Sequence, residues 1–170
     1  MLRHARIALA TLPFFATVAL AETPGSLSVP MWQQDSGGFY VQGVFKGEVE
    51  SDMLVDTGSS YVVLSRSTFA KLEHDPDTVY QRTIRGTTAA GRVTEAKVYT
   101  IAELTLGERC ILRNVEAVVL PRADRDILGL SALRRLQPFA LQFEPATLTM
   151  TACDSSGTLT MAATAHSTGG

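Results

Sequence analysis

The amino-acid sequence predicts an all-β domain. Short apolar, β-branched stretches recur from Leu27 onward, and clusters of glycine, proline and polar residues separate them. Only two segments have the spacing of a helix, and both are short. The chain has 170 residues, of which 45% are hydrophobic, which is enough for one domain with a sizeable core.

The first half of the domain is expected to contain three strands and a helix. Gly37-Gly38 opens the first strand, and Lys46-Gly47-Glu48 turns the chain into the second. Ser65 can cap the N-terminus of the helix, because its hydroxyl can accept a hydrogen bond from a main-chain N–H of the first turn. We place the strands at residues 39–45, 49–55 and 61–64, and the helix at 66–72.

The second half is expected to repeat this plan of strands, a glycine turn and a short helix, although the repeat is of pattern and not of residue identity. A long hairpin over 80–101 has its tip near residues 87–91. Strands are expected at 104–106, 111–112, 115–120 and 127–128, a helix at 131–136, and a final hairpin that pairs 139–143 with 147–151.

The N-terminus has the pattern of a secretory signal peptide. Arg3, His4 and Arg6 precede an apolar run over residues 7–20, and alanines at positions 19 and 21 are the small residues that a signal peptidase reads. This run of 14 residues would span about 21 Å as a helix, whereas a bilayer core is roughly 30 Å thick. We therefore expect residues 1–21 to be removed, with no stable membrane anchor, and the chain to be periplasmic or secreted; an uncleaved anchor is the alternative. Residues 22–153 then form the domain and 154–170 a disordered polar tail.

Composition excludes several classes of function. The 15 basic and 17 acidic side chains are not clustered, so there is no electrostatic footprint for nucleic acid. Beyond the signal only His74 and His166 remain, and no His/Cys cluster offers a metal site. Ser131 lacks the second glycine of a nucleophile elbow. The chemistry must rest on carboxylates, hydroxyls or the main chain, and no cofactor is implied.

Cys110 and Cys153 are the only cysteines. In an exported chain they are candidates for a disulfide. The alternative is two separate thiols, because sequence does not supply the Cα separation that decides the matter.

The segment LVDTGSS, residues 54–60, carries the candidate catalytic residue. Asp56 follows an apolar strand and enters a turn of small residues. Gly58 lets main-chain N–H groups approach the carboxylate, and Thr57 and Ser59 supply hydroxyls that can fix its orientation.

The chain resembles the retropepsin-like aspartic proteases over residues 39–153. LVDTGSS is similar to their catalytic motif, and Asp126-Ile127-Leu128-Gly129-Leu130 is similar to their second signature of two apolar residues and a glycine before a helix. Residues 87–92 lie where such proteins carry a flap. The resemblance implies a closed acid-protease β-barrel with two short helices and a flap hairpin.

The resemblance also implies a homodimer that hydrolyses peptides or unfolded proteins. The DTG triplet occurs once, whereas the chemistry requires two carboxyl groups sharing one water, so Asp56 of each subunit would supply half. The implied roles are catalytic for Asp56, substrate-binding for Gly58, Ala90 and Gly91, and supporting for Thr57, Ser59, Ile127, Leu128 and Gly129. Asp126 is the rival carboxylate. A catalytically silent peptide- or protein-binding domain of the same fold remains the alternative.

Three features depart from the family pattern. Ser59 stands where retroviral relatives usually have alanine, and donation from its hydroxyl to Asp56 would favour acidic activity. The segment 87–92 lacks the paired glycines of a mobile flap. A bridge at Cys153 would tie down the chain end that builds the dimer interface in retroviral enzymes.

Overall fold

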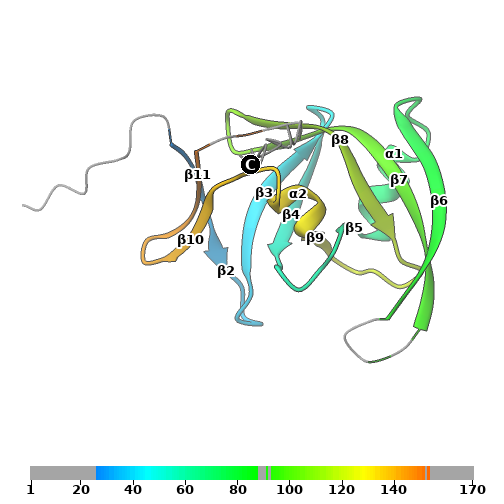
Figure 1. Ribbon diagram of the computed structural model, residues 1–170, viewed down its shortest axis with the longest axis horizontal. Helices are drawn as coiled ribbons and strands as arrows, with labels where there is room; N and C mark the ends of the chain where they lie inside the picture. Colours follow the sequence, from blue (N-terminus) through cyan, green and yellow to red (C-terminus); the bar gives the residue numbers. More distant parts are fainter. Residues whose placement is uncertain (1–25, 88–90, 92, 152, 154–170) are drawn as a thin grey trace, which may run out of the picture.

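The computed structural model describes residues 26–87, 91, 93–151 and 153. In this described part of the chain, eleven strands form two sheets, one of eight strands and one of three, and there are two short helices (Figure 1). In chain order the elements are β1 Leu27–Pro30, β2 Trp32–Gln33, β3 Phe39–Phe45, β4 Val49–Val55, β5 Val62–Leu64, α1 Arg66–Leu72, β6 Thr78–Thr87, β7 Val93–Leu106, β8 Cys110–Val119, β9 Asp126–Leu128, α2 Leu130–Leu133, β10 Phe139–Phe143 and β11 Ala146–Met150.

The larger sheet closes on itself as a barrel. Its order is β2-β3-β4-β9-β5-β8-β7-β6, and an additional pairing of β3 with β7 joins the ends of a ring of six strands. β2 and β6 lie outside this ring. The closed acid-protease barrel with two short helices is thereby confirmed.

One large hydrophobic core fills the barrel, and a second, smaller cluster consists of Val63, Ala96, Val98 and Val118. Phe45, Met53 and Leu104 are fully buried inside the large core. The large core includes Leu148 and Met150 from the smaller sheet, so the two sheets share it.

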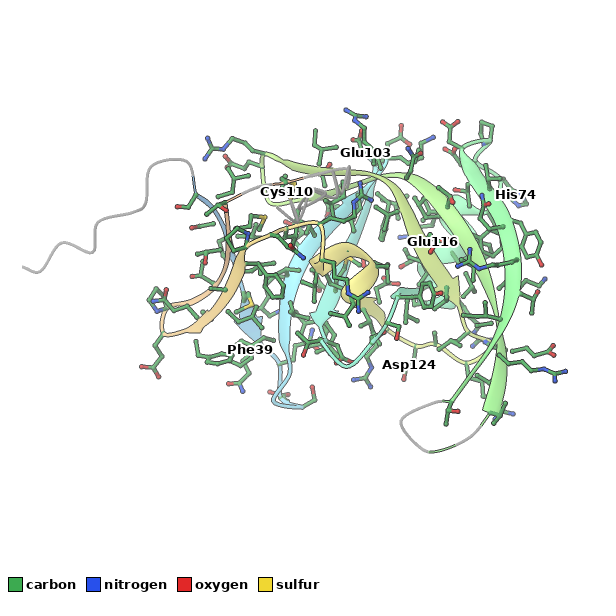
Figure 2. All side chains as sticks on the ribbon, viewed as in Figure 1. Phe39, His74, Glu103, Cys110, Glu116 and Asp124 are labelled. Carbon is green, nitrogen blue, oxygen red and sulfur yellow. A yellow bond between two sulfur atoms is a disulfide. The ribbon has the colours of Figure 1, made fainter. Side chains whose placement is uncertain are left out.

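The smaller sheet has the order β1-β11-β10, with both pairings antiparallel. Just beyond β11, Cys153 forms a disulfide with Cys110 at the start of β8, and their Cα atoms are 5.4 Å apart (Figure 2 labels Cys110). Of the two alternatives for Cys110 and Cys153, a disulfide or two separate thiols, the structure has the disulfide.

The expected repeat appears in the strand pairing. β4 is followed by the Asp56 turn and β5, and β8 is followed by a loop and β9. β4 pairs in parallel with β9, and β5 pairs in parallel with β8. Each of these pairings joins a strand of the first half to a strand of the second half.

Strand and helix bounds agree closely with expectation in the first half and less well in the second. β3, β4, α1 and β10 have the expected bounds. The break expected near Asn114 is instead a local irregularity inside β8: Asn114 has φ 51° and is not paired with β7, while Ile101–Val115 and Glu103–Arg113 on either side keep the same register. Asparagine tolerates this left-handed conformation better than most residues, so the strand continues through it.

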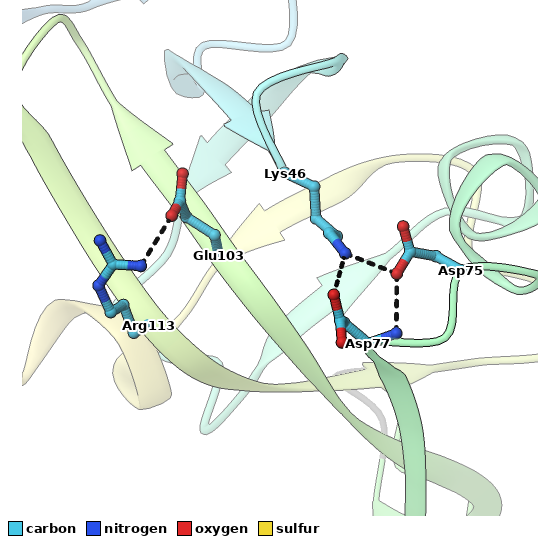
Figure 3. A network of polar contacts seen from close by, with 5 residues as sticks. All are labelled: Lys46, Asp75, Asp77, Glu103 and Arg113. Atoms are coloured by element: carbon cyan, nitrogen blue, oxygen red, sulfur yellow. Dashed lines mark hydrogen bonds and ion pairs between the residues drawn. The ribbon is translucent and has the colours of Figure 1, made fainter.

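A polar network ties the β3–β4 turn to the loop after α1 (Figure 3). The Lys46 ammonium lies 2.6 Å from carboxylate oxygens of both Asp75 and Asp77. Its hydrogen bond, together with the Asp77 main-chain N–H, lowers the pKa of Asp75, and the same carboxylates raise the pKa of Lys46.

We expect Lys46→Gln to reduce stability at neutral pH and to do so less as the medium becomes acidic. The lowered pKa of Asp75 means that this contribution is present above its ordinary value of 3.8 and is lost as the pH falls through the lower, folded-state value. Thermal unfolding from pH 7 down to pH 2 measures it, with Lys97→Gln, at an exposed position, as control. A stability difference that stays constant over that range contradicts the assignment.

Candidate active site

Asp56 is the first residue after β4, and its main chain is fixed from the neighbouring strand. Its N–H donates to the Leu128 carbonyl at 3.2 Å, which continues the parallel pairing of Leu54 with Ile127 and of Val55 with Leu128. Ile127 and Leu128 therefore lie beside the Asp56 turn, where the resemblance places them.

The turn after Asp56 fixes its side chain. The Gly58 N–H donates to Asp56 Oδ1 at 2.8 Å, and the Ser59 N–H donates to the Asp56 carbonyl at 3.2 Å. A Cβ at Gly58 would lie 3.1 Å from the same Oδ1, closer than most side chains allow. Gly58 thus brings an N–H to the carboxylate in the manner expected, and the side chain of Asp56 is half-buried.

The expected role of the Ser59 hydroxyl is wrong. Its oxygen donates to the Tyr61 carbonyl at 2.8 Å and not to Asp56, because the turn directs it along its own main chain. Ser59 supports the site by holding the turn, and it gives no reason to expect an acidic optimum.

We expect Ser59→Ala to leave the pH dependence of activity unchanged and to lower stability by about 1 kcal/mol, the typical net value of one hydrogen bond. Initial rates over a pH series, together with thermal unfolding, test both parts. A pH optimum that is higher in the variant than in the wild type would contradict this prediction and indicate that the Ser59 hydroxyl contacts Asp56.

Gly129 holds the second signature against the turn. A Cβ there would lie 2.0 Å from the Tyr61 carbonyl oxygen and 2.8 Å from that of Ser59, so only glycine fits. The first residues of α2 then bond to the turn, as the Leu130 N–H donates to Ser59 O at 2.8 Å and the Ser131 N–H to Ser60 O at 3.0 Å.

Two further candidates from the sequence are structural. The Ser131 hydroxyl donates to the Glu116 carbonyl and accepts from the Val62 N–H, both at 2.8 Å, so it joins β8 to β5. Asp126 is buried, with 6% exposed, and its carboxylate accepts hydrogen bonds from Ser51 Oγ, the Ser65 N–H and Thr68 Oγ1. The rival carboxylate is thus occupied in tying β4 and the start of α1 to β9.

β6 and β7 form the long hairpin on which the resemblance places the flap. Its strands pair from Thr78–Ile101 to Thr87–Val93, and Gly91 at the tip is exposed with φ 75°. Ala90 lies outside the described residues, so its expected substrate contact has no structural description. Thr57, in the Asp56 turn, is exposed.

The β6–β7 hairpin is held against the rest of the barrel by hydrogen bonds that the sequence did not indicate. Arg82 on β6 bonds both carboxylate oxygens of Glu116, at 2.7 and 3.3 Å, and donates to the Tyr61 hydroxyl at 3.4 Å (Figure 2 labels Glu116). Glu116 raises the pKa of the Arg82 guanidinium as a result. The partners lie 21 and 34 positions away, a separation over which no local pattern operates.

A polar groove of about 720 Å³ lies between β4, α1 and the loop before β9. Its walls include Glu50, Asp52, Lys71, Asp124 and Arg125, but not Asp56. Arg122, Asp124 and Arg125, in the loop before β9, are exposed. Asp124 raises the pKa of its neighbour Arg125.

Among the residues that the structure describes, no group of three or more His, Cys, Asp or Glu side chains is placed to bind a metal ion. Neither described helix is long or apolar enough for a membrane span.

A model of the family described as "gag-polyprotein putative aspartyl protease" matches residues 41–135, a segment that contains both signatures. The chain belongs to this retropepsin-like family. A solved structure agrees in fold: the crystal structure of a retropepsin-like aspartic protease from Rickettsia conorii has a TM-score of 0.55 and 24% sequence identity, and the match covers 74% of this chain and 89% of that one.

A curated protein from Azoarcus sp. (strain BH72), named triosephosphate isomerase, is 36% identical over 136 residues. The alignment covers 78% of this chain and 51% of that protein, so the chain spans about half of its relative's length. A triosephosphate isomerase barrel alternates eight parallel strands with helices. The described residues form a mostly antiparallel barrel with two short helices instead, so the fold of this chain differs from that of a triosephosphate isomerase.

Proposed function

We propose that this protein is an aspartic endopeptidase that works as a homodimer, with Asp56 of each subunit forming the catalytic pair. The observation that carries the proposal is the Asp56 turn. It is fixed on both sides, by the Leu128 carbonyl on its N–H and by the Gly58 N–H on its carboxylate, while the side chain stays half-buried and accessible.

The reaction requires two carboxyl groups around one water. One carboxylate takes a proton from the water as it attacks the peptide carbonyl, and the other, protonated, donates a hydrogen bond to the carbonyl oxygen. The resulting tetrahedral intermediate breaks down when the amide nitrogen receives a proton and leaves as an amine. A two-fold axis supplies both groups from one sequence.

Membership of an aspartyl protease family supports the proposed substrate class. Asp56 is half-buried and Thr57 and Gly58 are exposed, so an extended peptide would bind against the Asp56 turn, and peptides and unfolded proteins are the proposed substrates. The N-terminal sequence pattern supports an exported, periplasmic or secreted location.

Purified protein and an unstructured polypeptide, incubated from acidic to neutral pH, test the proposal. We expect cleavage by the wild type and a loss of about 10³-fold or more with Asp56→Asn, since general acid–base catalysis contributes on that order. Equal cleavage by both proteins would rule out the protease, and binding of the polypeptide without cleavage would favour the silent peptide-binding domain.

A further inference from the structure

The Asp126 carboxylate is buried and hydrogen-bonded on both oxygens. Its Oδ1 accepts from the Ser65 N–H, and its Oδ2 accepts from the hydroxyls of Ser51 and Thr68, each at 2.5 Å. The three donor residues are themselves buried, and none of the donor groups is charged. A carboxylate inside a protein is costly unless its oxygens are hydrogen-bonded, so the three donors and Asp126 must keep their relative places.

The donors come from chain segments on either side of β9. Ser51 lies on β4, Ser65 is the N-cap of α1 directly after β5, and Thr68 lies in the first turn of α1. In the ring of the barrel, β9 lies between β4 and β5 (Figure 1). Asp126 is the first residue of β9, so its side chain fastens the start of this strand to both neighbours.

The other end of β9 holds Asp56. The carbonyl of Leu128, the last residue of β9, accepts from the Asp56 N–H at 3.2 Å. β9 has three residues and pairs with β5 at a single position, Ile127 opposite Val63. A strand this short has few main-chain hydrogen bonds to fix its place along β4, so the side-chain contacts of Asp126 supply much of that fixing. A shift at the start of β9 therefore moves the Leu128 carbonyl at its end.

We propose that Asp126 is a positioning residue for Asp56: by fixing the start of β9, it sets where the Leu128 carbonyl meets the Asp56 N–H. The inference rests on the proposed function, because the place of Asp56 matters for hydrolysis only if its carboxylate reacts. Asp126 acts through the main chain of β9 and is not itself catalytic. Misplacement of a reacting group by about 1 Å can lower a rate by about 100-fold.

Asparagine at position 126 would keep the size of the side chain but not its pattern of hydrogen bonds. The main-chain N–H of Ser65 can only donate, so the amide oxygen has to face it. The amide NH2 group then meets the hydroxyls of Ser51 and Thr68, which donate to the wild-type carboxylate. The Thr68 hydroxyl already accepts from the Ser65 hydroxyl at 3.0 Å, which leaves it little capacity to accept again. The start of β9 is expected to shift away from this contact.

Kinetics with an unstructured polypeptide test the effect on the reaction. We expect Asp126→Asn to lower kcat at least about tenfold while KM changes less than about threefold, because the place of the reacting group changes and the substrate contacts do not. Ser51→Ala removes one donor to Asp126, so it is expected to lower kcat in the same direction, and it serves as the test if Asp126→Asn does not fold. All rates are measured well below the unfolding midpoints.

Ser67→Ala is the matched control for loss of a hydroxyl. The exposed Ser67 hydroxyl is hydrogen-bonded to that of Ser65 at 3.0 Å and not to Asp126, so its kcat is expected to stay within about twofold of the wild type. A wild-type kcat in both Asp126→Asn and Ser51→Ala, or an equal loss in the control, overturns the proposal.

Hydrogen exchange reports the place of the turn without reference to activity. In chains that also carry Asp56→Asn, so that none cleaves itself, we expect Asp126→Asn to speed exchange of the main-chain N–H at position 56 at least about tenfold. Ile101→Val is the control for a general loss of stability, because Ile101 is fully buried on β7 and makes no bond to Asp126. After correction for the difference in unfolding free energy, an acceleration no larger than in the control overturns the proposal.

The two measurements separate the positioning of the turn from the proteolytic function. Faster exchange at position 56 in a protein whose wild type cleaves nothing refutes the protease and supports the positioning. An Asp56-dependent protease in which Asp126→Asn keeps both its kcat and its exchange rate refutes the positioning alone.

Discussion

An excess of Asp56→Asn chain is expected to suppress cleavage by the wild-type chain. Each active site in the proposed dimer needs two aspartates, so a mixed dimer has none that works. Random exchange at equal amounts leaves about one quarter of the dimers fully wild type, and activity per wild-type chain falls to about half. At a ninefold excess of the variant it falls to about one tenth.

Native mass spectrometry of the mixture verifies that subunits have exchanged. The variant keeps an acceptor for the Gly58 N–H, because the asparagine amide oxygen can occupy the position of Asp56 Oδ1. We therefore expect its fold and its association to be retained. Activity per wild-type chain that is indifferent to the variant would mean that one chain carries a complete site.

Gly129→Ala is expected to be among the most destabilising single changes in the protein. The added Cβ would lie 2.0 Å from the Tyr61 carbonyl oxygen, and neither that main chain nor the one carrying Gly129 can move without losing the bonds that join the turn to α2. Overpacking of this kind costs about 3 kcal/mol or more, which lowers the unfolding midpoint by about 10 °C or more.

Gly86→Ala is the matched control, since a Cβ at that position meets nothing within 4 Å. Its unfolding midpoint is expected to change by about 2 °C or less. A Gly129→Ala protein as stable as this control would show that the turn and the second signature are not in close contact. Cleavage by the Gly129→Ala chain, measured well below its midpoint, is expected to fall as well because the Asp56 turn shifts.

Local signals predicted much of the first half of the fold. β3, β4 and α1 have the expected bounds, and the Ser65 hydroxyl accepts from the Thr68 N–H as expected of a helix cap. Apolar alternation, glycine turns and capping act over a few residues, so a sequence displays them directly.

The remaining features depend on residues far apart in the chain. The three donors to Asp126 come from 58, 61 and 75 positions away, and the β3–β7 pairing that closes the barrel joins residues about as distant. The acceptor of the Ser59 hydroxyl is a local feature that the sequence nevertheless does not determine. Both candidates lay within reach of the turn, and only its three-dimensional path directs the hydroxyl to Tyr61.

The parallel pairing of β4 with β9 has a consequence for the order of folding. Met53 is opposite Asp126, so this contact closes a loop of more than seventy intervening residues. Contacts between such distant positions form late and slowly. A partly folded chain in which β9 has not yet paired with β4 therefore lacks the bond from the Asp56 N–H to the Leu128 carbonyl, and the turn that carries this carboxylate is held only from its own side.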